Sequence, residues 1–372
     1  MIETVELHFN LQSILDILGL VQGTTLGILL LILNYRRHRS TFFLGLFLLL
    51  FSLKLAIFIP KGLNLELVYP ELFLLPFNFS WLLFPIFFIY SQKVSIFSNQ
   101  KIKYWVLFPG ILSFLLQVIL YFLPYSTKLV IAESIWHELI FTIFGISYGW
   151  VIGLWNLKLL SQHRMEVQNT FSSVESKVLN WARVFLIYSL VTSVIIHIMY
   201  YIAPQNYYFK IIFSIFDLIA IYWVAVNGVR QRDVFSELFI RDVDTNRLPK
   251  EIDTKNLETK DLNTFMEQIN DYVKASDCFE RKDLTIIDLA EELGVHPKRL
   301  STTINTVLKK NFNNFINEHR IKKAEELLKH IEAPNLSIEG IGNEVGFQSK
   351  SAFYSAFKKF TGTTPTKYKE DS

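Results

Sequence analysis

The sequence has very little cysteine and, over its first 230 residues, very little charge. Cys278 is the single cysteine among 372 residues, which excludes an intramolecular disulfide and a multi-cysteine metal site. Residues 1–230 hold 15 basic and 10 acidic residues, about 11% of that stretch, whereas residues 231–372 hold 22 and 24, about 32%. Soluble domains average about 25% charged residues. The first 230 residues are therefore not an ordinary cytosolic domain.

Signals for catalysis and for a cleaved leader are also missing. Glu3 and Glu6 stand where a secretory signal needs basic residues, so we expect the first apolar run to be a retained anchor. His137-Glu138 begins a zinc-protease H-E-x-x-H motif, but Phe141 replaces the second histidine. His163 is followed by no glycine-rich nucleotide-binding segment, which argues against a histidine kinase. We expect no enzyme activity, no catalytic residue, no metal and no cofactor.

Long apolar runs dominate residues 1–230. Each approaches the roughly 20 residues that cross a bilayer as a helix. They predict an all-α fold with a seven-helix transmembrane bundle as the first domain, residues 1–230. The expected spans are Leu11 to Asn34, Phe42 to Ile59, Glu71 to Tyr90, Tyr104 to Leu123, Ile135 to Leu157, Trp181 to Ala203 and Tyr208 to Val229.

Basic residues are distributed unevenly between the two sides of these spans. Basic residues concentrate in cytoplasmic loops, so the bias predicts an outside amino terminus and a cytoplasmic carboxy-terminal part. Three basic residues fall on the outer side, Lys61, Lys128 and Lys210. Ten fall on the inner side: Arg36, Arg37, Arg39, Lys93, Lys101, Lys103, Lys158, Arg164, Lys177 and Arg183.

A few ionisable and amide side chains lie inside the expected spans, all in the outer half. Such residues are costly in hydrocarbon and should face the bundle interior. Two interpretations stay open: Lys54 and Asp217 neutralise each other and lock two helices, or the set lines an outward-open pocket for a small-molecule or envelope signal. The candidate sensor residues are Lys54, Asn78, Gln117, Glu138, His197 and Asp217.

After residue 230 the composition changes to that of a soluble protein. Residues 231–261 are polar and turn-rich, which predicts a cytoplasmic linker. From Leu262 onward apolar residues recur at helical spacing, so a second domain is expected over residues 262–372.

This second domain contains an internal repeat. Thr285–Gly294 and Ser337–Gly346 each begin with a hydroxyl that can cap a helix and end with a glycine suited to a tight turn. A second helix follows each, from Pro297 or after Ser349. This pattern is typical of two helix-turn-helix units.

The exposed face of each second helix carries residues of the kinds that contact bases and phosphates. Because a recognition helix enters the major groove amino end first, these residues predict contacts with double-stranded DNA, although a solvated polar face is the simpler alternative. The helix expected from Asn313 to His330 spans about 27 Å, which would place the recognition helices in successive major grooves. The candidates are Lys298, Arg299, Ser301, Thr302, Asn305, Lys350, Ser351, Tyr354 and Ser355.

These residues closely resemble the DNA-binding domain of the AraC/XylS family of transcription regulators. The resemblance covers about Leu262 to Tyr368 and includes Arg320, Gly346-Phe347 and Phe357-Lys358-Lys359-Phe360. It implies base contacts from the early recognition-helix positions, and we expect Lys358 and Lys359 to bind DNA without regard to sequence. His296 departs from the usual serine cap. Gly340 and Gly342 should weaken the first helix of the second unit by up to about 1 kcal/mol each.

Together with the seven spans, the chain resembles the membrane-bound AraC-type regulators, a likeness that extends to the loop Asn169 to Ser173. The resemblance therefore implies a one-component sensor and transcription regulator in a bacterial inner membrane. Its expected partners are double-stranded DNA, membrane lipid and the signal molecule, with RNA polymerase and a second copy of the chain as further candidates. The alternative is a transporter or membrane enzyme whose substrate flux is reported by the DNA-binding domain.

Overall fold

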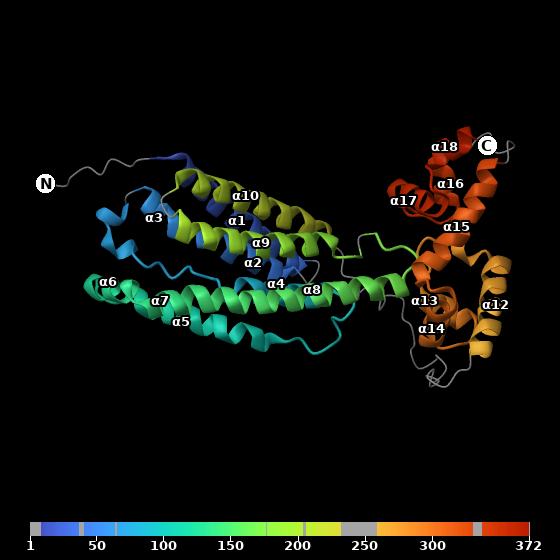
Figure 1. Ribbon diagram of the computed structural model, residues 1–372, viewed down its shortest axis with the longest axis horizontal. Coiled ribbons are helices and arrows are strands. Elements are labelled where there is room, and N and C mark those ends of the chain that lie inside the picture. Colours follow the sequence, from blue (N-terminus) through green and yellow to red (C-terminus); the bar gives the residue numbers. More distant parts are fainter. Residues whose placement is uncertain are drawn as a thin grey trace. The chain divides into compact units, whose positions relative to one another are not determined.

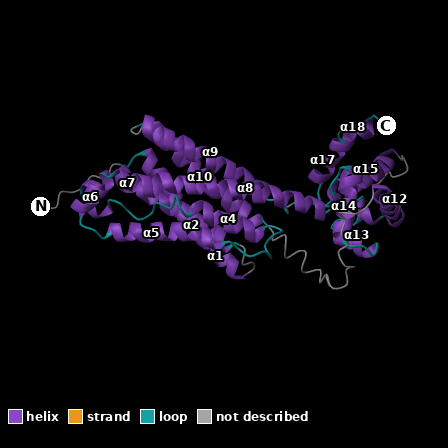
Figure 2. Cartoon of the chain, turned by 60° about the horizontal axis from the view of Figure 1, so that its bottom comes forward, coloured by secondary structure: helices purple, strands orange, loops and turns teal. Residues whose placement is uncertain are grey.

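The computed structural model describes residues 9–36, 41–63, 65–175, 177–203, 206–231, 259–329 and 337–371, which are helices and loops with one isolated antiparallel bridge (Figure 2). The chain divides into two compact units. The amino-terminal unit comprises Met1–His163 and Leu179–Glu237, and the carboxy-terminal unit comprises Arg164–Val178 and Leu238–Ser372. Most of the expected linker, residues 232–258, lies outside the described residues.

Among the described residues of the amino-terminal unit, six helices are long and apolar enough to cross a membrane. This arrangement is typical of a multi-pass membrane protein. Many large apolar side chains face outward, such as Phe122, 79% exposed, and Ile202, 73% exposed, which suits contact with lipid. The six are α1 (Leu11–Arg36), α2 (Phe42–Leu53) continued by η1 (Lys54–Ile57) and α3 (Phe58–Gly62), η4 (Tyr104–Leu107) with α5 (Phe108–Tyr121), α7 (Ile135–Glu138) continued by η5 (Leu139–Ile143) and α8 (Phe144–Thr170), α9 (Asn180–Ile202) and α10 (Tyr207–Arg230).

The structure does not have the single helix that the sequence predicts over Glu71 to Tyr90. A short 3₁₀ turn, η3 (Pro70–Leu72), precedes ten residues of irregular chain, and α4 (Leu83–Val94) follows. Pro76 has no N–H to donate within a helix, and Leu74 has a φ of 58°, which no right-handed helix allows. At about 1.5 Å per residue, the 12 residues of α4 span roughly 18 Å, less than a bilayer core. We call residues 73–94 the broken segment.

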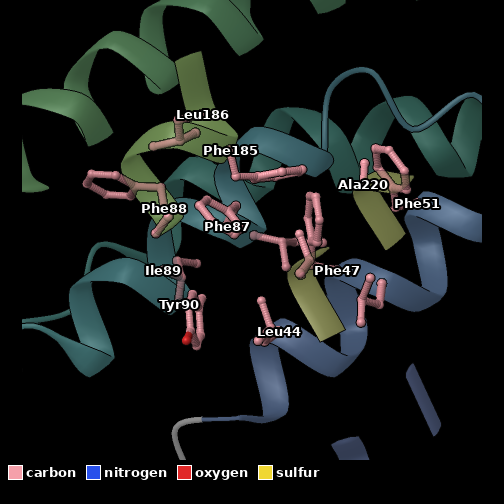
Figure 3. Close-up of a cluster of buried hydrophobic side chains, with 14 of the residues drawn as sticks. Leu44, Phe47, Phe51, Phe87, Phe88, Ile89, Tyr90, Phe185, Leu186 and Ala220 are labelled. Atoms are coloured by element: carbon pink, nitrogen blue, oxygen red, sulfur yellow. The ribbon is translucent and has the colours of Figure 1, made fainter. Parts of the chain in front are cut away.

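The broken segment nevertheless contributes to the core of the amino-terminal unit. Phe87 and Phe88 of α4 are almost completely buried, and the Phe87 ring centroid lies 5.2 Å from those of Phe47 on α2 and Phe185 on α9 (Figure 3). Close approach of α1 and α2 depends on small residues, because a Cβ atom added to Gly27 would lie 3.0 Å from the Gly45 carbonyl oxygen. A short helix, α6 (Tyr125–Glu133), precedes α7.

The carboxy-terminal unit has two small cores at the two ends of one long helix, α15 (Phe312–Lys329) (Figure 1). The first core packs α12 (Thr259–Ser276), η7 (Cys278–Glu280), α13 (Ile286–Glu292) and α14 (Pro297–Leu308) against the start of α15. The second packs α16 (Ile338–Glu344), α17 (Lys350–Thr361) and α18 (Pro365–Glu370) against its end.

Candidate nucleic-acid interface

The first helix-turn-helix unit consists of α13 and α14. The Thr285 hydroxyl accepts from the Asp288 backbone N–H and the Asp288 carboxylate accepts from the Thr285 N–H, which completes a capping box at the start of α13. Gly294 makes the turn with a φ of 66°. His296 replaces the usual serine without loss of the cap, because its Nδ1 accepts from the Lys298 N–H at 3.2 Å.

The second unit consists of α16 and α17 and depends on two glycines. Gly346 has a φ of 95°, and a Cβ atom there would lie 2.6 Å from the Glu280 carbonyl oxygen. A Cβ atom on Gly342 would lie 2.8 Å from the Phe353 ring, so glycine lets α16 and α17 cross closely. The Ser337 hydroxyl accepts from the Gly340 N–H and caps α16. Gly342 is expected to lower the stability of α16 as a helix. The close crossing of α16 and α17 nevertheless requires glycine at this position.

On α14, most of the predicted DNA-binding residues lie on one face. Lys298 is exposed, while Ser301, Thr302 and Asn305 are half-buried, and Asn305 Nδ2 donates to Ser301 Oγ at 3.3 Å. Arg299 differs, because its guanidinium lies over the Phe265 ring of α12 at 4.5 Å. Arg299 therefore contributes to packing between helices.

On α17, the predicted residues surround the amino-terminal end and the outer face. Ser351, Ser355 and Lys358 are exposed, and Lys350 forms an ion pair with Glu339. The Tyr354 hydroxyl lies 3.1 Å from Thr366 Oγ1, and Lys359 Nζ donates to Asn314 Oδ1 at 2.6 Å. The face is basic and hydroxyl-rich, as expected for phosphate and base contacts.

Arg320, in the middle of α15, contacts both cores, because it bonds to Phe279 of the first and its guanidinium lies 5.5 Å from the ring of Phe347 of the second. It is fully buried, and its guanidinium donates to the carbonyl oxygens of Phe279 at 2.7 Å and Arg281 at 2.8 Å. Burial lowers the pKa of Arg320 to about 10, which still leaves it charged at neutral pH. The neighbouring His319 stacks on Phe279, and burial lowers its pKa to about 4, so it is neutral there.

One part of the carboxy-terminal unit was missed by sequence reasoning. Residues 164–178, which we call the strap, comprise the last residues of α8 and the chain that follows them, and they belong to the carboxy-terminal unit with the DNA-binding helices. Phe171 forms the antiparallel bridge to Thr285, and the Glu175 carboxylate accepts from Ser349 Oγ at 2.7 Å and from Ser351 Oγ at 3.2 Å. The only sequence signal was the family resemblance of residues 169–173.

In the amino-terminal unit, two of the sensor candidates form an ion pair. Lys54 Nζ lies 3.0 Å from Asp217 Oδ1, which is the mutual neutralisation considered from the sequence. Asp16 was missed: it is buried on α1 and accepts from the Ser214 hydroxyl at 2.7 Å. A carboxylate inside the first expected span was the signal that could have identified it.

The other four candidates make different contacts. Gln117 pairs with the Asn78 backbone, accepting from its N–H at 3.1 Å and donating to its carbonyl at 2.9 Å. Glu138 accepts from the Tyr201 hydroxyl, and His197 Nδ1 lies 2.6 Å from the Ser193 carbonyl oxygen. The six candidates therefore form separate contacts instead of one cluster. Within the described parts of the chain, no group of His, Cys, Asp and Glu is arranged to hold a metal ion.

Two helix-turn-helix units joined by a long helix define the carboxy-terminal unit as a DNA-binding domain. Comparison with known proteins agrees, since a family model described as a helix-turn-helix domain matches residues 289–371. The chain is similar to the HTH-type transcriptional regulator AlkR of Acinetobacter baylyi, with 26% identity over 28% of this chain and 33% of that protein. It is also similar to the Msm operon regulatory protein of Streptococcus mutans, with 32% identity over 24% of this chain and 31% of that protein.

Among solved structures, the C-terminal domain of AraT, a response regulator from Geobacillus stearothermophilus, is 32% identical over 30% of this chain and 88% of that one, with a TM-score of 0.27. The family model and the two curated relatives support an AraC-type helix-turn-helix DNA-binding domain at the carboxy terminus of the chain. The chain spans about a third of the length of the two named curated relatives.

Proposed function

We propose that the protein is a membrane-bound one-component transcription regulator, which senses a signal through its transmembrane domain and binds specific DNA through its two helix-turn-helix units. The observation that carries the proposal is the presence, in one chain, of six bilayer-length apolar helices and an AraC-type DNA-binding domain. Input and output then need no phosphotransfer between proteins, and no catalytic step is required.

The DNA-binding part of the proposal rests on the geometry of α15. Its 18 residues give a length of about 27 Å, close to the roughly 34 Å of one DNA turn. We propose that α14 and α17 enter successive major grooves, with Lys298, Ser301 and Ser351 reading base edges. Fifteen basic and twelve acidic residues over residues 281–372 give only a small positive charge. The non-specific electrostatic affinity should therefore be modest, and base contacts should matter.

We propose that the broken segment is a seventh crossing. Irregular backbone is tolerated at membrane depth when it is buried in protein and its polar groups are satisfied. The Asn78 Nδ2 and Ser80 hydroxyl both donate to the Phe141 carbonyl oxygen, at 3.2 and 2.8 Å, and Trp81 Nε1 donates to the Ile140 carbonyl oxygen at 2.8 Å. Both acceptors lie in the π-helical turn η5. With seven crossings, the ten-to-three basic bias favours an amino terminus on the outside.

Topology can be tested with a reporter enzyme that is active only in the cytoplasm. Fusions after Arg39, Asn99, Arg164 and Arg232 should be active, and fusions after Leu63, Ser126 and Pro204 should be inactive, because the basic loops stay inside. Activity after both Asn99 and Leu63 would show that the broken segment does not cross.

For sensing, we propose that the Lys54–Asp217 ion pair holds α2 and α10 in one arrangement that a small-molecule or envelope signal changes. A ligand shifts such an equilibrium only by its differential affinity for the two states, and a few kcal/mol are sufficient. The broken segment gives a specific reason to keep a second candidate, a transporter, since discontinuous helices often line substrate sites. Substrate uptake by liposomes containing the full chain would favour that candidate.

The central test of the proposed function is a map of the DNA that the full chain binds in cells, obtained by cross-linking and sequencing. Discrete sites with two half-sites about 10 base pairs apart are expected, because α15 sets that separation. A Lys298→Ala, Ser351→Ala double variant at equal abundance is the control and should lose these sites. Bound DNA distributed evenly over the chromosome in both strains would refute specific binding.

A further inference from the structure

The strap is built into the DNA-binding domain by backbone pairing. The Ser172 N–H donates to the Leu284 carbonyl oxygen at 3.0 Å, directly before α13, and Ser173 Oγ donates to the Lys282 carbonyl oxygen at 2.8 Å. Phe171 and Ser172 are 5% and 1% exposed. In Figure 1 the yellow-green chain that follows α8 reaches α13. This part of the strap is a fixed component of the domain.

The strap also forms hydrogen bonds with α15, the helix that joins the two helix-turn-helix units. Asn313 Nδ2 on α15 donates to the Ser172 carbonyl oxygen at 2.6 Å, and Arg320 Nη2 donates to the Ser172 hydroxyl at 3.1 Å. At the amino-terminal end of the strap, Asn311 Nδ2 donates to Gln168 Oε1 at 3.3 Å. Residues 168–172 are thereby anchored on the first helix-turn-helix unit and on α15, while residues 173–175 extend toward the second helix-turn-helix unit.

At the far end, Glu175 occupies the start of the recognition helix α17. Its carboxylate accepts from the hydroxyl of Ser349, the residue that caps α17, and from the exposed Ser351. The amino-terminal end of a helix carries partial positive charge and attracts anions, phosphate included. A carboxylate at this position uses hydrogen-bond donors that DNA would need, and it repels an approaching phosphate.

We propose that the strap is a built-in competitor of DNA: Glu175 holds the hydroxyl donors of α17 in the free protein and must leave before α17 can enter a major groove. This inference rests on the proposed function, since it concerns the regulation of the same DNA site. The position of the strap in the chain would let the apolar helices regulate DNA binding. The strap joins α8 directly to α9, so a movement of either helix acts on Glu175 without passing through residues 232–258.

The test uses the full chain in lipid nanodiscs and a fluorescent duplex about 30 base pairs long, taken from one of the discrete bound sites so that it covers two half-sites. Glu175→Gln keeps the shape of the side chain and removes its charge, and it should bind the duplex roughly three- to tenfold more tightly than wild type. Glu175→Asp keeps the charge at a shorter reach and should fall between. Glu166→Gln, an exposed position on α8 with the same charge change, is the matched control and should stay within about twofold of wild type.

Amide hydrogen exchange on the same samples reports the position of the strap. On addition of duplex, exchange over residues 173–178 should accelerate, while the Ser172 amide, which donates to Leu284, should stay protected. Protection of the Ser172 amide in Glu175→Gln shows that the variant strap is still docked. Unchanged exchange over residues 173–178 would contradict displacement by DNA.

The outcomes separate this inference from the proposed function. Absence of duplex binding by wild type and all variants overturns the proposed function. Binding with equal affinity in wild type and Glu175→Gln overturns the strap inference alone, as does weaker binding by Glu175→Gln. An equal gain in Glu166→Gln would assign the effect to overall charge and would also overturn it.

Discussion

Replacing Arg320 by methionine should destabilise the DNA-binding domain by about 3–5 kcal/mol, because it removes a buried charge whose hydrogen bonds satisfy buried backbone groups. Methionine nearly preserves the volume, but it leaves the carbonyl oxygens of Phe279 and Arg281 without this donor. It also removes the donor to Ser172, so the strap and the two helix-turn-helix units should loosen together.

Hydrogen exchange of α13 and α15 in the full chain measures this loss, which should appear as a more than hundredfold faster exchange of their protected amides. The matched control is Arg281→Met. Arg281 forms an ion pair with Glu292 at 2.8 Å, its side chain is 46% exposed, and its loss should cost less than about 1 kcal/mol. Because the amino-terminal unit and the carboxy-terminal unit have separate cores, the Arg320→Met protein should still accumulate in the membrane. Protection equal to wild type would show that Arg320 does not hold the domain together.

The second large effect is expected at the recognition helices. Lys298→Ala should weaken binding to the preferred DNA at least tenfold and change the preferred base, because each good contact to a base edge is worth about 1–3 kcal/mol. Lys358→Ala should instead weaken all sequences alike and reduce the slope of affinity against salt by about one, as expected for a phosphate contact.

Binding-site selection followed by titration at several salt concentrations distinguishes these effects. Lys309→Ala is the charge-matched control, since Lys309 lies at the opposite, carboxy-terminal end of α14. It should change neither the preferred sequence nor, beyond about twofold, the affinity. An unchanged preferred sequence in Lys298→Ala would show that this lysine does not read bases.

The helix-turn-helix units follow closely from the sequence because their determinants are local. Thr285, Ser337 and Ser349 each cap a helix through a backbone N–H three residues away, and the turn glycines have the expected positive φ. Hydrophobic periodicity likewise places five of the long apolar helices within a few residues of their expected bounds and both ends of α15 within one.

The features that sequence reasoning missed depend on distant partners. An apolar run over Glu71 to Tyr90 satisfies the composition of a span, but Asn78 and Ser80 find their partners on α5 and in η5, so irregular backbone is stable there. The strap has no periodicity of its own, and its partners lie more than 100 residues away. No local pattern indicates such pairing.

The separation between Ser172 and Arg320 has a consequence for how the protein is made. These residues are 148 positions apart in the chain, so at roughly 5–20 residues per second the strap waits about 7–30 s after its own synthesis for its partner. During that interval the ribosome produces α9 and α10, so both apolar helices are synthesised before Arg320. The DNA-binding domain is therefore completed only on chains whose last two apolar helices have already been synthesised. Folding of this domain thus depends on prior synthesis of the apolar part.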